Sequence, residues 1–289
     1  MKGSTMRPKR WRPSDPAVRR PKGCLGKGTR QHRTDLKKRT LGLICGTVCT
    51  TFLVLILLTI HVAAVAAADK GELAKKTLNP VADLISLPIQ FNYDHKIGPM
   101  DDGRKYVVNI QPVIPFSIGP NWNVISRTIL PLVDQDDILP GGEADASGLG
   151  DTTQSFFFSP KKPTAQGWIW GVGPVLLLPT ATDDDLGGEK WGLGPTAVAL
   201  KQEHGFTYGL LANHIWSVAG DSDRSDISAT YLQPFFAYTT KTFTSFTINT
   251  ESTYDWMDDE WSVPINFMVS QVLKIGSQPV SLQAGPRYW

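Results

Sequence analysis

The chain has few cysteines, and none of them lies in its larger part. All three, Cys24, Cys45 and Cys49, precede residue 69 of the 289 residues. The remainder therefore has no cysteine for a disulfide framework, a thiolate metal site or a cysteine nucleophile. This absence suits a chain that crosses an oxidising compartment, where free thiols can mispair.

Catalytic and metal-binding motifs are also missing. The sequence has no G-x-S-x-G, P-loop or H-E-x-x-H pattern. After residue 68 the only histidines are His95, His204 and His214, and their spacing is not that of metal ligands. His214 and Ser217 lie three apart, so on a strand they face opposite sides and do not pair. The sequence predicts no enzyme, no cofactor and no resident metal.

One acidic stretch partly matches a calcium-binding loop. "DSDRSD" (Asp221–Asp226) begins like an EF-hand loop, but it lacks the glycine at the sixth position and has Leu232 at the twelfth. It is interpreted as a solvated acidic turn, with a loop calcium site as the alternative.

Positive charge is scarce beyond residue 68. Residues 1–68 hold 14 of the 29 Lys and Arg residues and two of the 27 Asp and Glu residues, which leaves 15 basic and 25 acidic residues in 69–289. The larger part therefore carries a formal charge of −10. A nucleic-acid partner is excluded on this ground, because phosphate neutralisation needs clustered Lys and Arg.

The first 68 residues contain the pattern of a secretory signal. The basic "LKKRT" precedes a long apolar run that ends in A-x-A triplets at Ala64–Ala66 and Ala66–Ala68. This pattern predicts a signal peptide over 36–68, with an uncleaved transmembrane anchor as the alternative. Residues 1–35 are interpreted as a basic N-terminal extension, either disordered or a start codon assigned too early.

Hydrophobic residues beyond residue 83 alternate with a period of two. In 84–94 the odd positions are apolar and the even positions mostly polar, and 105–116 and 261–274 show the same pattern. We count eleven such segments, which begin near Leu84, Lys105, Asn121, Gly150, Gly167, Lys190, Gly205, Asp226, Thr242, Trp261 and Ser277. Residues 69–83, with "DKGELAKK", lack the alternation and are interpreted as a short helix or a periplasmic N-terminal segment.

The length of these segments favours a membrane-spanning sheet. Several run for about 10–12 residues, whereas strands of soluble proteins average about 5–6 and tilted membrane strands need about 9–11. Acidic long loops alternate with short turns, which is the layout of an outer-membrane barrel. The predicted fold class is all-β, an antiparallel transmembrane β-barrel over 84–289. A soluble all-β sandwich is the alternative.

Two sets of residues follow from the barrel prediction. Polar side chains inside strands should face the lumen, because a charge facing lipid at mid-depth costs about 2–4 kcal/mol. The lumen candidates are Asn109, Gln111, Arg127, Gln154, Gln233, Asn249 and Glu251. Tryptophans near segment ends should form aromatic girdles at the headgroup level. The girdle candidates are Trp122, Trp168, Trp170, Trp191, Trp216 and Trp261.

Prolines recur inside the predicted strands. Pro174, Pro195, Pro234 and Pro264 each remove one donor from a strand ladder. Their distribution, one to a strand over four strands, predicts a row of bulges around the wall.

Several stretches resemble a known family. "NPVADLISLPIQFNY", "NIQPVIPF", "GLGDTTQSFFFSP", "GVGPVLLLPTATDDDLGGEKWGLGPTAVAL" and "WSVPINFMVSQVLKIGSQPVSL" are similar to an outer-membrane transporter family of Gram-negative bacteria. Its members are often catalogued as "transporter" or, misleadingly, as neuromedin U. It is distantly similar to outer-membrane proteins of phenol-degradation pathways. The resemblance covers about residues 77–289 and implies a β-barrel in the outer membrane without a particular substrate.

The chain departs from this family at its end. Family members continue past "GPRYW" with one more amphipathic strand, and eleven segments is an odd count where bacterial barrels have even numbers. We expect a twelfth strand to be missing through truncation. The alternatives are an odd barrel whose edge strands pair in parallel, or a partner strand from residues 69–83.

The sequence therefore predicts a porin or transporter that passes small solutes across the outer membrane. A sealed structural or adhesive barrel, its lumen plugged by a polar network, is the alternative. The expected partners are outer-membrane lipid, the barrel-assembly machinery during insertion, and a small solute that the sequence does not name. Acidic loops at the mouth should give a mild preference for cations or neutral solutes, unless Arg127 points into the constriction.

Overall fold

The computed structural model describes residues 70–138, 145–275 and 278–289. The predicted N-terminal extension (1–35) and signal peptide (36–68) lie outside the described residues. The described residues form one helix, α2, and sixteen strands. Their bounds are α2 Lys70–Thr77, β1 Ile89–Ile97, β2 Gly103–Ile110, β3 Val113–Ser117, β4 Trp122–Asp136, β5 Ala146–Leu149, β6 Thr152–Pro160, β7 Trp168–Leu178, β8 Lys190–Glu203, β9 Phe206–Gly220, β10 Ser228–Thr239, β11 Thr244–Thr250, β12 Ser252–Asp255, β13 Glu260–Ser262, β14 Ile265–Ile275, β15 Gln278–Ala284 and β16 Arg287–Tyr288.

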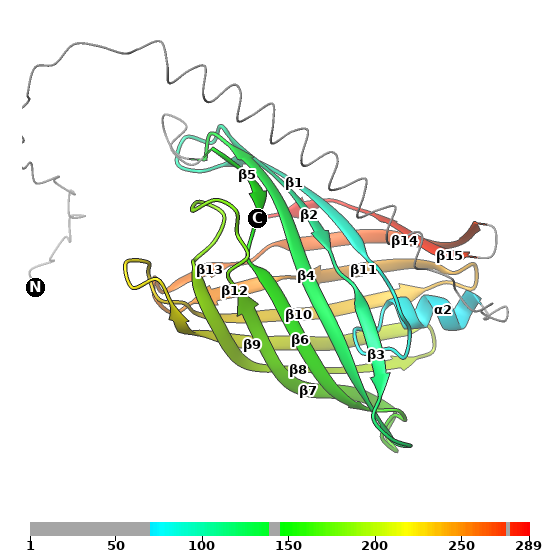
Figure 1. The fold of residues 1–289 in the computed structure, drawn as a ribbon. Helices are drawn as coiled ribbons and strands as arrows, with labels where there is room; N and C mark the ends of the chain where they lie inside the picture. The colour runs from blue at the N-terminus through cyan, green and yellow to red at the C-terminus, as the bar shows by residue number, and fades with distance from the viewer. Residues whose placement is uncertain (1–69, 139–144, 276–277) are drawn as a thin grey trace, which may run out of the picture. The chain divides into compact units, whose positions relative to one another are not determined.

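All strands belong to one antiparallel sheet. The hydrogen-bonded order is β1-β2-β4-β6-β7-β8-β9-β10-β11-β14-β15, so each strand pairs with the next along the chain (Figure 1). The other five strands continue members of this path across a short break: β3 after β2, β5 before β6, β12 after β11, β13 before β14, and β16 after β15. The sheet thus has eleven continuous strands, which correspond one to one with the eleven predicted segments.

The predicted helix in "DKGELAKK" is α2. An ion pair between Glu72 and Lys76, 3.1 Å apart and one turn from each other, accompanies it. Among the described residues, no helix is long and apolar enough to cross a membrane.

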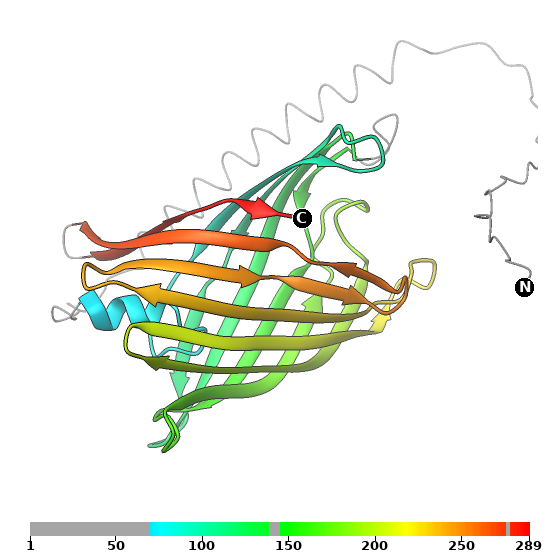
Figure 2. The same ribbon diagram turned by 180° about the vertical axis from the view of Figure 1, so that it is seen from behind.

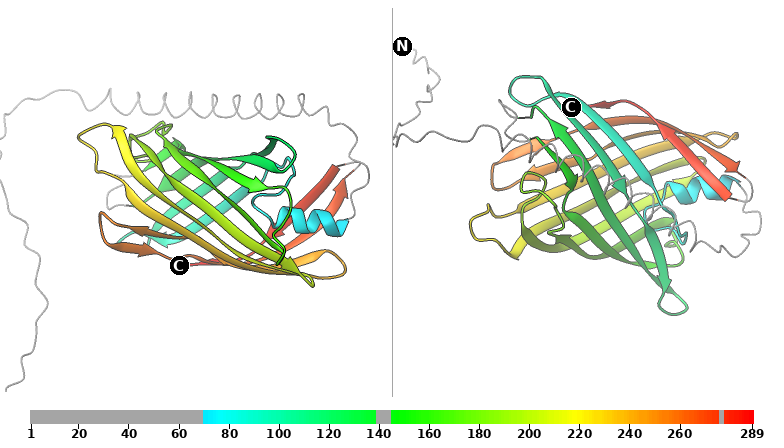
Figure 3. Two further views of the ribbon diagram at one scale, coloured as in Figure 1. Left: turned by 90° about the horizontal axis from the view of Figure 1, so that it is seen from below. Right: turned by 45° about the horizontal axis from the view of Figure 1, so that its top comes forward.

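The sheet curls strongly, so that it has a concave inner face and a convex outer face (Figures 2 and 3). Residues paired across a ladder point to the same face. The buried pair Ile125 and Phe157 marks the inner face, where it joins a hydrophobic cluster with Val198, Leu200 and Leu211. The outer face carries large exposed apolar side chains: Ile89, Phe91, Val172, Leu193, Leu210, Phe236, Phe246, Ile248 and Phe267.

Ladder pairing is interrupted along a row of prolines. Between β6 and β7 the pairs Ser155–Val175 and Phe158–Val172 flank an irregular stretch that contains Pro174. Similar breaks contain Pro195 on β8, Pro264 before β14 and Pro286 before β16. Each of these prolines lacks the N–H that a regular ladder would use. The predicted row of bulges is nevertheless wrong, because ladder pairs are missing at Pro174 and Pro195 without a shift in register, and Pro234 pairs regularly with Leu210.

The glycines before three of these prolines lie against a neighbouring backbone. A Cβ placed on Gly173 would lie 1.9 Å from the Phe156 carbonyl oxygen, and one on Gly194 would lie 1.6 Å from that of His214. A Cβ on Gly285 would lie 1.8 Å from the Phe267 carbonyl oxygen. Only glycine permits this approach, so Gly-Pro pairs recur where neighbouring strands come unusually close.

The two edge strands meet at one end only. Within the described ranges, no ladder joins β1 to β15. Trp289 donates from Nε1 to Asp94 Oδ1 of β1 at 3.0 Å, and Arg287 Nε lies 4.0 Å from the same oxygen. These side chains join β1 to the end of the chain at the side of the sheet where the long loops lie (Figure 1).

The segment before β1 lies inside the curl of the sheet. Val81, which is 5% exposed, belongs to the inner hydrophobic cluster with Ile125 and Phe157. Leu73 and Ala74 of α2 pack against Val272 of β14, and Gln202 of β8 donates to the Lys75 carbonyl at 2.9 Å. The sequence did not predict this position, because its lack of alternation says nothing about what it packs against.

Candidate functional site

Polar side chains on the inner face form a connected chain around Arg127. The guanidinium of Arg127 donates from Nη2 to Gln111 Oε1 at 2.9 Å. Gln111 in turn donates to Gln90 Oε1 at 3.0 Å, and Gln90 donates to Asn92 Oδ1 at 3.1 Å. Arg127 belongs to β4 and is paired with Val113 of β3, so its guanidinium lies beside an apolar side chain on this wall of the interior.

A second polar group lies on the β10–β11–β14 wall. Gln233 donates to Glu251 Oε1 at 3.5 Å, and Asn266 donates to Asn249 Oδ1 at 2.8 Å. Tyr231 lies on the same inner face, two residues before Gln233. Tyr231 packs against the inner cluster that contains Ile125 of β4, and the charge of Glu251 acts on Arg127, so the two walls face the same space.

The interior is therefore mixed in character. Val113, Ile169, Tyr231 and Phe235 are partly buried and pack against the inner cluster that contains Val81. We call the set Gln90, Gln111, Arg127, Tyr231, Gln233, Asn249, Glu251 and Asn266 the inner polar cluster. Of the lumen candidates, Asn109, Gln111, Arg127, Gln233, Asn249 and Glu251 lie on the inner face. Gln90, Tyr231 and Asn266 were not among the candidates, although Gln90 falls on the predicted polar face of its segment.

Gln154 is the lumen candidate that the structure places differently. It pairs with Thr128 of β4, on the face opposite to the buried Ser155 and Phe157. Its amide donates to Ser126 Oγ at 3.0 Å, and its carbonyl oxygen accepts from Thr128 Oγ1 at 2.6 Å. The expectation that Gln154 faces the interior is wrong, because neighbouring hydroxyl groups on the outer face satisfy its amide.

All six girdle candidates lie on the outer face near strand ends. Trp122, Trp168 and Trp170 lie near the short turns, where Trp122 and Trp170 form an edge-on pair with centroids 5.8 Å apart. Trp191, Trp216 and Trp261 lie toward the long loops and are 51%, 48% and 56% exposed. Two separate aromatic rows are the arrangement found at the two interfaces of a membrane.

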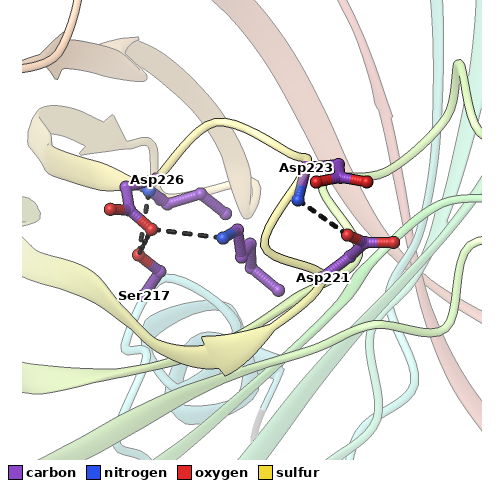
Figure 4. A network of polar contacts seen from close by, with 6 residues as sticks. Ser217, Asp221, Asp223 and Asp226 are labelled. Atoms are coloured by element: carbon purple, nitrogen blue, oxygen red, sulfur yellow. Dashed lines mark hydrogen bonds and ion pairs between the residues drawn. The ribbon is translucent and has the colours of Figure 1, made fainter.

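The long loops β7–β8 and β9–β10 are tied together by charged side chains (Figure 4). Lys190 Nζ, whose side chain is 8% exposed, lies 3.2 Å from Asp226 Oδ1, which also accepts from Ser217 at 3.0 Å. The hydrogen bonds from Lys190 and Ser217 lower the pKa of Asp226. Arg224 donates to the carbonyl oxygens of Asp184 and Gly187 and so fastens one loop to the other.

Glu189 lies in the same group of loops. Desolvation raises the pKa of Glu189, and the negative charge of Asp184 raises it further. Asp221 accepts from the backbone N–H of Asp223 at 2.8 Å, which makes "DSDRSD" a local turn. In the part of the chain that the structure describes, no group of three or more His, Cys, Asp or Glu side chains is placed to hold a metal.

The histidine and serine weighed as a catalytic pair have different partners. His214 Nδ1 lies 2.7 Å from Thr230 Oγ1 on the outer face, with its ring 4.1 Å from that of Trp216. Ser217 bonds to Asp226 in the loop network. This separation agrees with the argument that residues three apart on a strand face opposite sides.

A single curled antiparallel sheet with next-neighbour pairing is the architecture of up-and-down β-barrels, both soluble and membrane-spanning. The chain is similar in fold to the COG4313 outer membrane channel from Pseudomonas putida F1, with a TM-score of 0.51. The match covers 70% of this chain and 84% of that one at 18% sequence identity. No protein-family model matches the chain, and no curated protein is similar to it in sequence.

Proposed function

We propose that this chain is a bacterial outer-membrane channel for small solutes. The observation that carries the proposal is the division of the sheet into an apolar outer face with two tryptophan rows and an inner face with a polar cluster. A water-filled or solute-filled interior explains why Arg127 and Glu251 lie inside, whereas Phe236, Ile248 and Phe267 are exposed outside. The fold similarity to an outer-membrane channel supports the same function.

The proposal includes a sheet closed as a barrel in lipid. Unpaired backbone groups cost several kcal/mol each in hydrocarbon, so the facing edges of β1 and β15 must be satisfied there. The contacts of Asp94 with Arg287 and Trp289 support closure at the loop end. Export through the signal peptide and insertion by the barrel-assembly machinery complete the proposed route to the outer membrane.

The segment before β1 is proposed to narrow the channel. Val81 packs among inner-face side chains that would otherwise line an open pathway, and α2 rests on Val272 at the short-turn end. This packing also favours the second candidate function, a sealed barrel with a structural role. The two functions differ in whether the segment leaves the interior when a solute passes.

Planar-bilayer conductance of the full chain separates the two functions. Val81→Asp places a carboxylate in the apolar cluster and should drive the segment out, because an unpaired buried charge is strongly disfavoured. We expect the wild type to carry a small current and Val81→Asp to carry a current several-fold larger. Asp83→Asn, an exposed change in the same segment, is the matched control and should behave as the wild type. A lack of current in wild type and Val81→Asp alike would contradict the channel and support the sealed barrel.

A further inference from the structure

Arg127 lies on the inner face and has no acidic neighbour in contact. Lys190 is bonded to Asp226, and Asp94 acts on both Lys105 and Arg287. Among the described residues, no carboxylate oxygen lies within 4.0 Å of the Arg127 guanidinium. Its hydrogen-bond partner is the neutral amide of Gln111, which occupies one of five N–H donors.

The acid whose charge acts on Arg127, Glu251, belongs to a different wall of the sheet. Glu251 accepts from Gln233, and it influences Arg127 by charge through the interior without forming an ion pair. Four of the five guanidinium N–H donors thus remain for a carboxylate from outside the chain, and a second negative charge on the same molecule would be repelled by Glu251. The arrangement selects for a single negative charge.

The surface beside Arg127 is apolar on the β3 side, whereas its ladder partner on β6 is Ser155. Val113 is its ladder partner and Ile125, two residues earlier on β4, shares its face. Tyr231 and Phe235 pack against the same cluster. A ligand whose carboxylate bonds to the guanidinium would place its remaining atoms against these side chains and gain from their burial.

We propose that Arg127 forms an anion-binding site inside the barrel, and that the site takes a small organic monoanion with one carboxylate and an apolar body. The guanidinium provides a planar fork for the carboxylate. Val113, Tyr231 and Phe235 contact the apolar body, and Glu251 excludes dianions. This inference rests on the proposed channel function for its role in transport, but the binding site itself does not require conduction.

Calorimetric titration of the folded full-length protein in detergent at low salt tests the site. The probes are benzoate, its neutral isostere benzamide, and terephthalate, which has two carboxylates. We expect benzoate to bind more tightly than either other probe. Arg127→Gln should weaken benzoate binding by about tenfold or more and leave benzamide unchanged, because a charge-assisted hydrogen bond contributes about 1.5–3 kcal/mol.

Further variants keep the test decisive if Arg127→Gln folds poorly. Arg127→Lys preserves the charge without the fork and should bind benzoate with intermediate affinity. Glu251→Gln should tighten terephthalate binding more than benzoate binding. Lys105→Gln removes another inner-face cation and is the matched control, which should leave benzoate binding within about twofold of the wild type. Heat-modifiable migration in gels verifies that each variant is folded.

Specific results would overturn the site. Equal affinities for benzoate and benzamide, or an equal loss in Lys105→Gln and Arg127→Gln, would show that no carboxylate site exists at Arg127, and so would the lack of binding of any probe. Conductance is measured separately on the same preparations. If the protein binds benzoate through Arg127 but carries no current, the binding site is supported and the channel function is contradicted. If the protein conducts but does not bind benzoate through Arg127, the channel function is supported and the binding site is contradicted.

Discussion

At the scale of single residues, the Gly-Pro pairs decide how closely adjacent strands approach. Gly194 precedes Pro195 at a break in the β8–β9 ladder, and the His214 carbonyl occupies the position that a side chain would need. Proline removes the N–H and glycine removes the Cβ, so the strands stay close without a regular bond. Gly173 and Gly285 also precede prolines and lie against a neighbouring carbonyl, so the same close approach of strands recurs at three places in the sheet.

Gly194→Ala should therefore destabilise the sheet. Its Cβ would lie 1.6 Å from a backbone oxygen, which cannot move as a flexible side-chain tip can. We expect a loss of at least about 1–3 kcal/mol, the usual cost of overpacking, and a lower yield of heat-modifiable protein. Gly188→Ala is the matched control, since its Cβ would meet the end of the Ile227 side chain at 3.1 Å. Equal yields of the two variants would show that the approach of β8 to β9 is not constrained.

Asp226 gives the loop network a dependence on pH. The pKa of Asp226 is lowered in the folded chain by Lys190 and Ser217. Its contribution to stability is therefore complete above the ordinary aspartate pKa of about 3.9 and is lost as the pH falls through the lowered folded value. Amide hydrogen exchange at the β9–β10 loop should accelerate over this acidic range.

Asp226→Asn should remove this acid-dependent step. It also leaves the buried Lys190 ammonium without its carboxylate, so exchange in this loop should be faster than in the wild type at neutral pH. Asp223→Asn alters an exposed carboxylate of the same loop and should keep the wild-type profile (Figure 4). An unchanged profile in Asp226→Asn would mean that another group governs the loop.

At the scale of elements, strand positions could be predicted and one strand face could not. Alternation located the eleven strands, because several of the long strands have one apolar and one mostly polar face. The start of β6 has no such contrast, since Thr153, Gln154 and Ser155 are all polar. Periodicity therefore could not tell that Ser155 faces inward and Gln154 outward, and the hydroxyls that satisfy Gln154 come from β4.

The segment before β1 shows a second limit of sequence reasoning. A helical pattern in residues 70–77 was readable, but the contacts of Val81 with β4 and β6 join residues far apart in the sequence. Similarly, Arg127 was recognised as an inner-face residue from the cost of exposing charge to lipid. Its lack of an ion-pair partner depends on the positions of Asp94, Asp226 and Glu251 in the folded chain.

The meeting of β1 with the last strand depends on Asp94. This carboxylate, whose side chain is 10% exposed, accepts from Trp289 and faces Arg287. Asp94→Ala should lower the temperature at which the folded form is lost in heat-modifiability gels, because charge-assisted bonds contribute about 1.5–3 kcal/mol and Arg287 would lose its acid. Asp102→Ala, an exposed change in the β1–β2 turn, should match the wild type. Equal transition temperatures for the two variants would show that Asp94 does not hold the edges together.

At the scale of the whole molecule, the acidic residues of the long loops and the basic Arg127 of the interior should affect the passage of ions in different ways. Residues 69–289 carry a formal charge of −10, and acids gather in the long loops. Loop acids raise the local cation concentration and are screened by salt, whereas Arg127 lies inside, where screening is weak. A mild cation preference for small ions is therefore compatible with a binding site for an organic anion.

Reversal potentials across a salt gradient measure this balance. We expect the wild type to favour K⁺ over Cl⁻ mildly, with the preference shrinking as salt rises from about 0.1 M to 1 M and the Debye length falls from about 10 Å to 3 Å. Arg127→Gln should increase cation preference at every salt concentration, because the negative charge of Glu251 is then no longer offset by Arg127. Glu251→Gln should shift the preference toward anions by a comparable amount. Asp223→Asn changes one exposed loop acid and should shift it only at low salt. Clear anion selectivity of the wild type at low salt would mean that Arg127, and not the loops, sets the passage of ions.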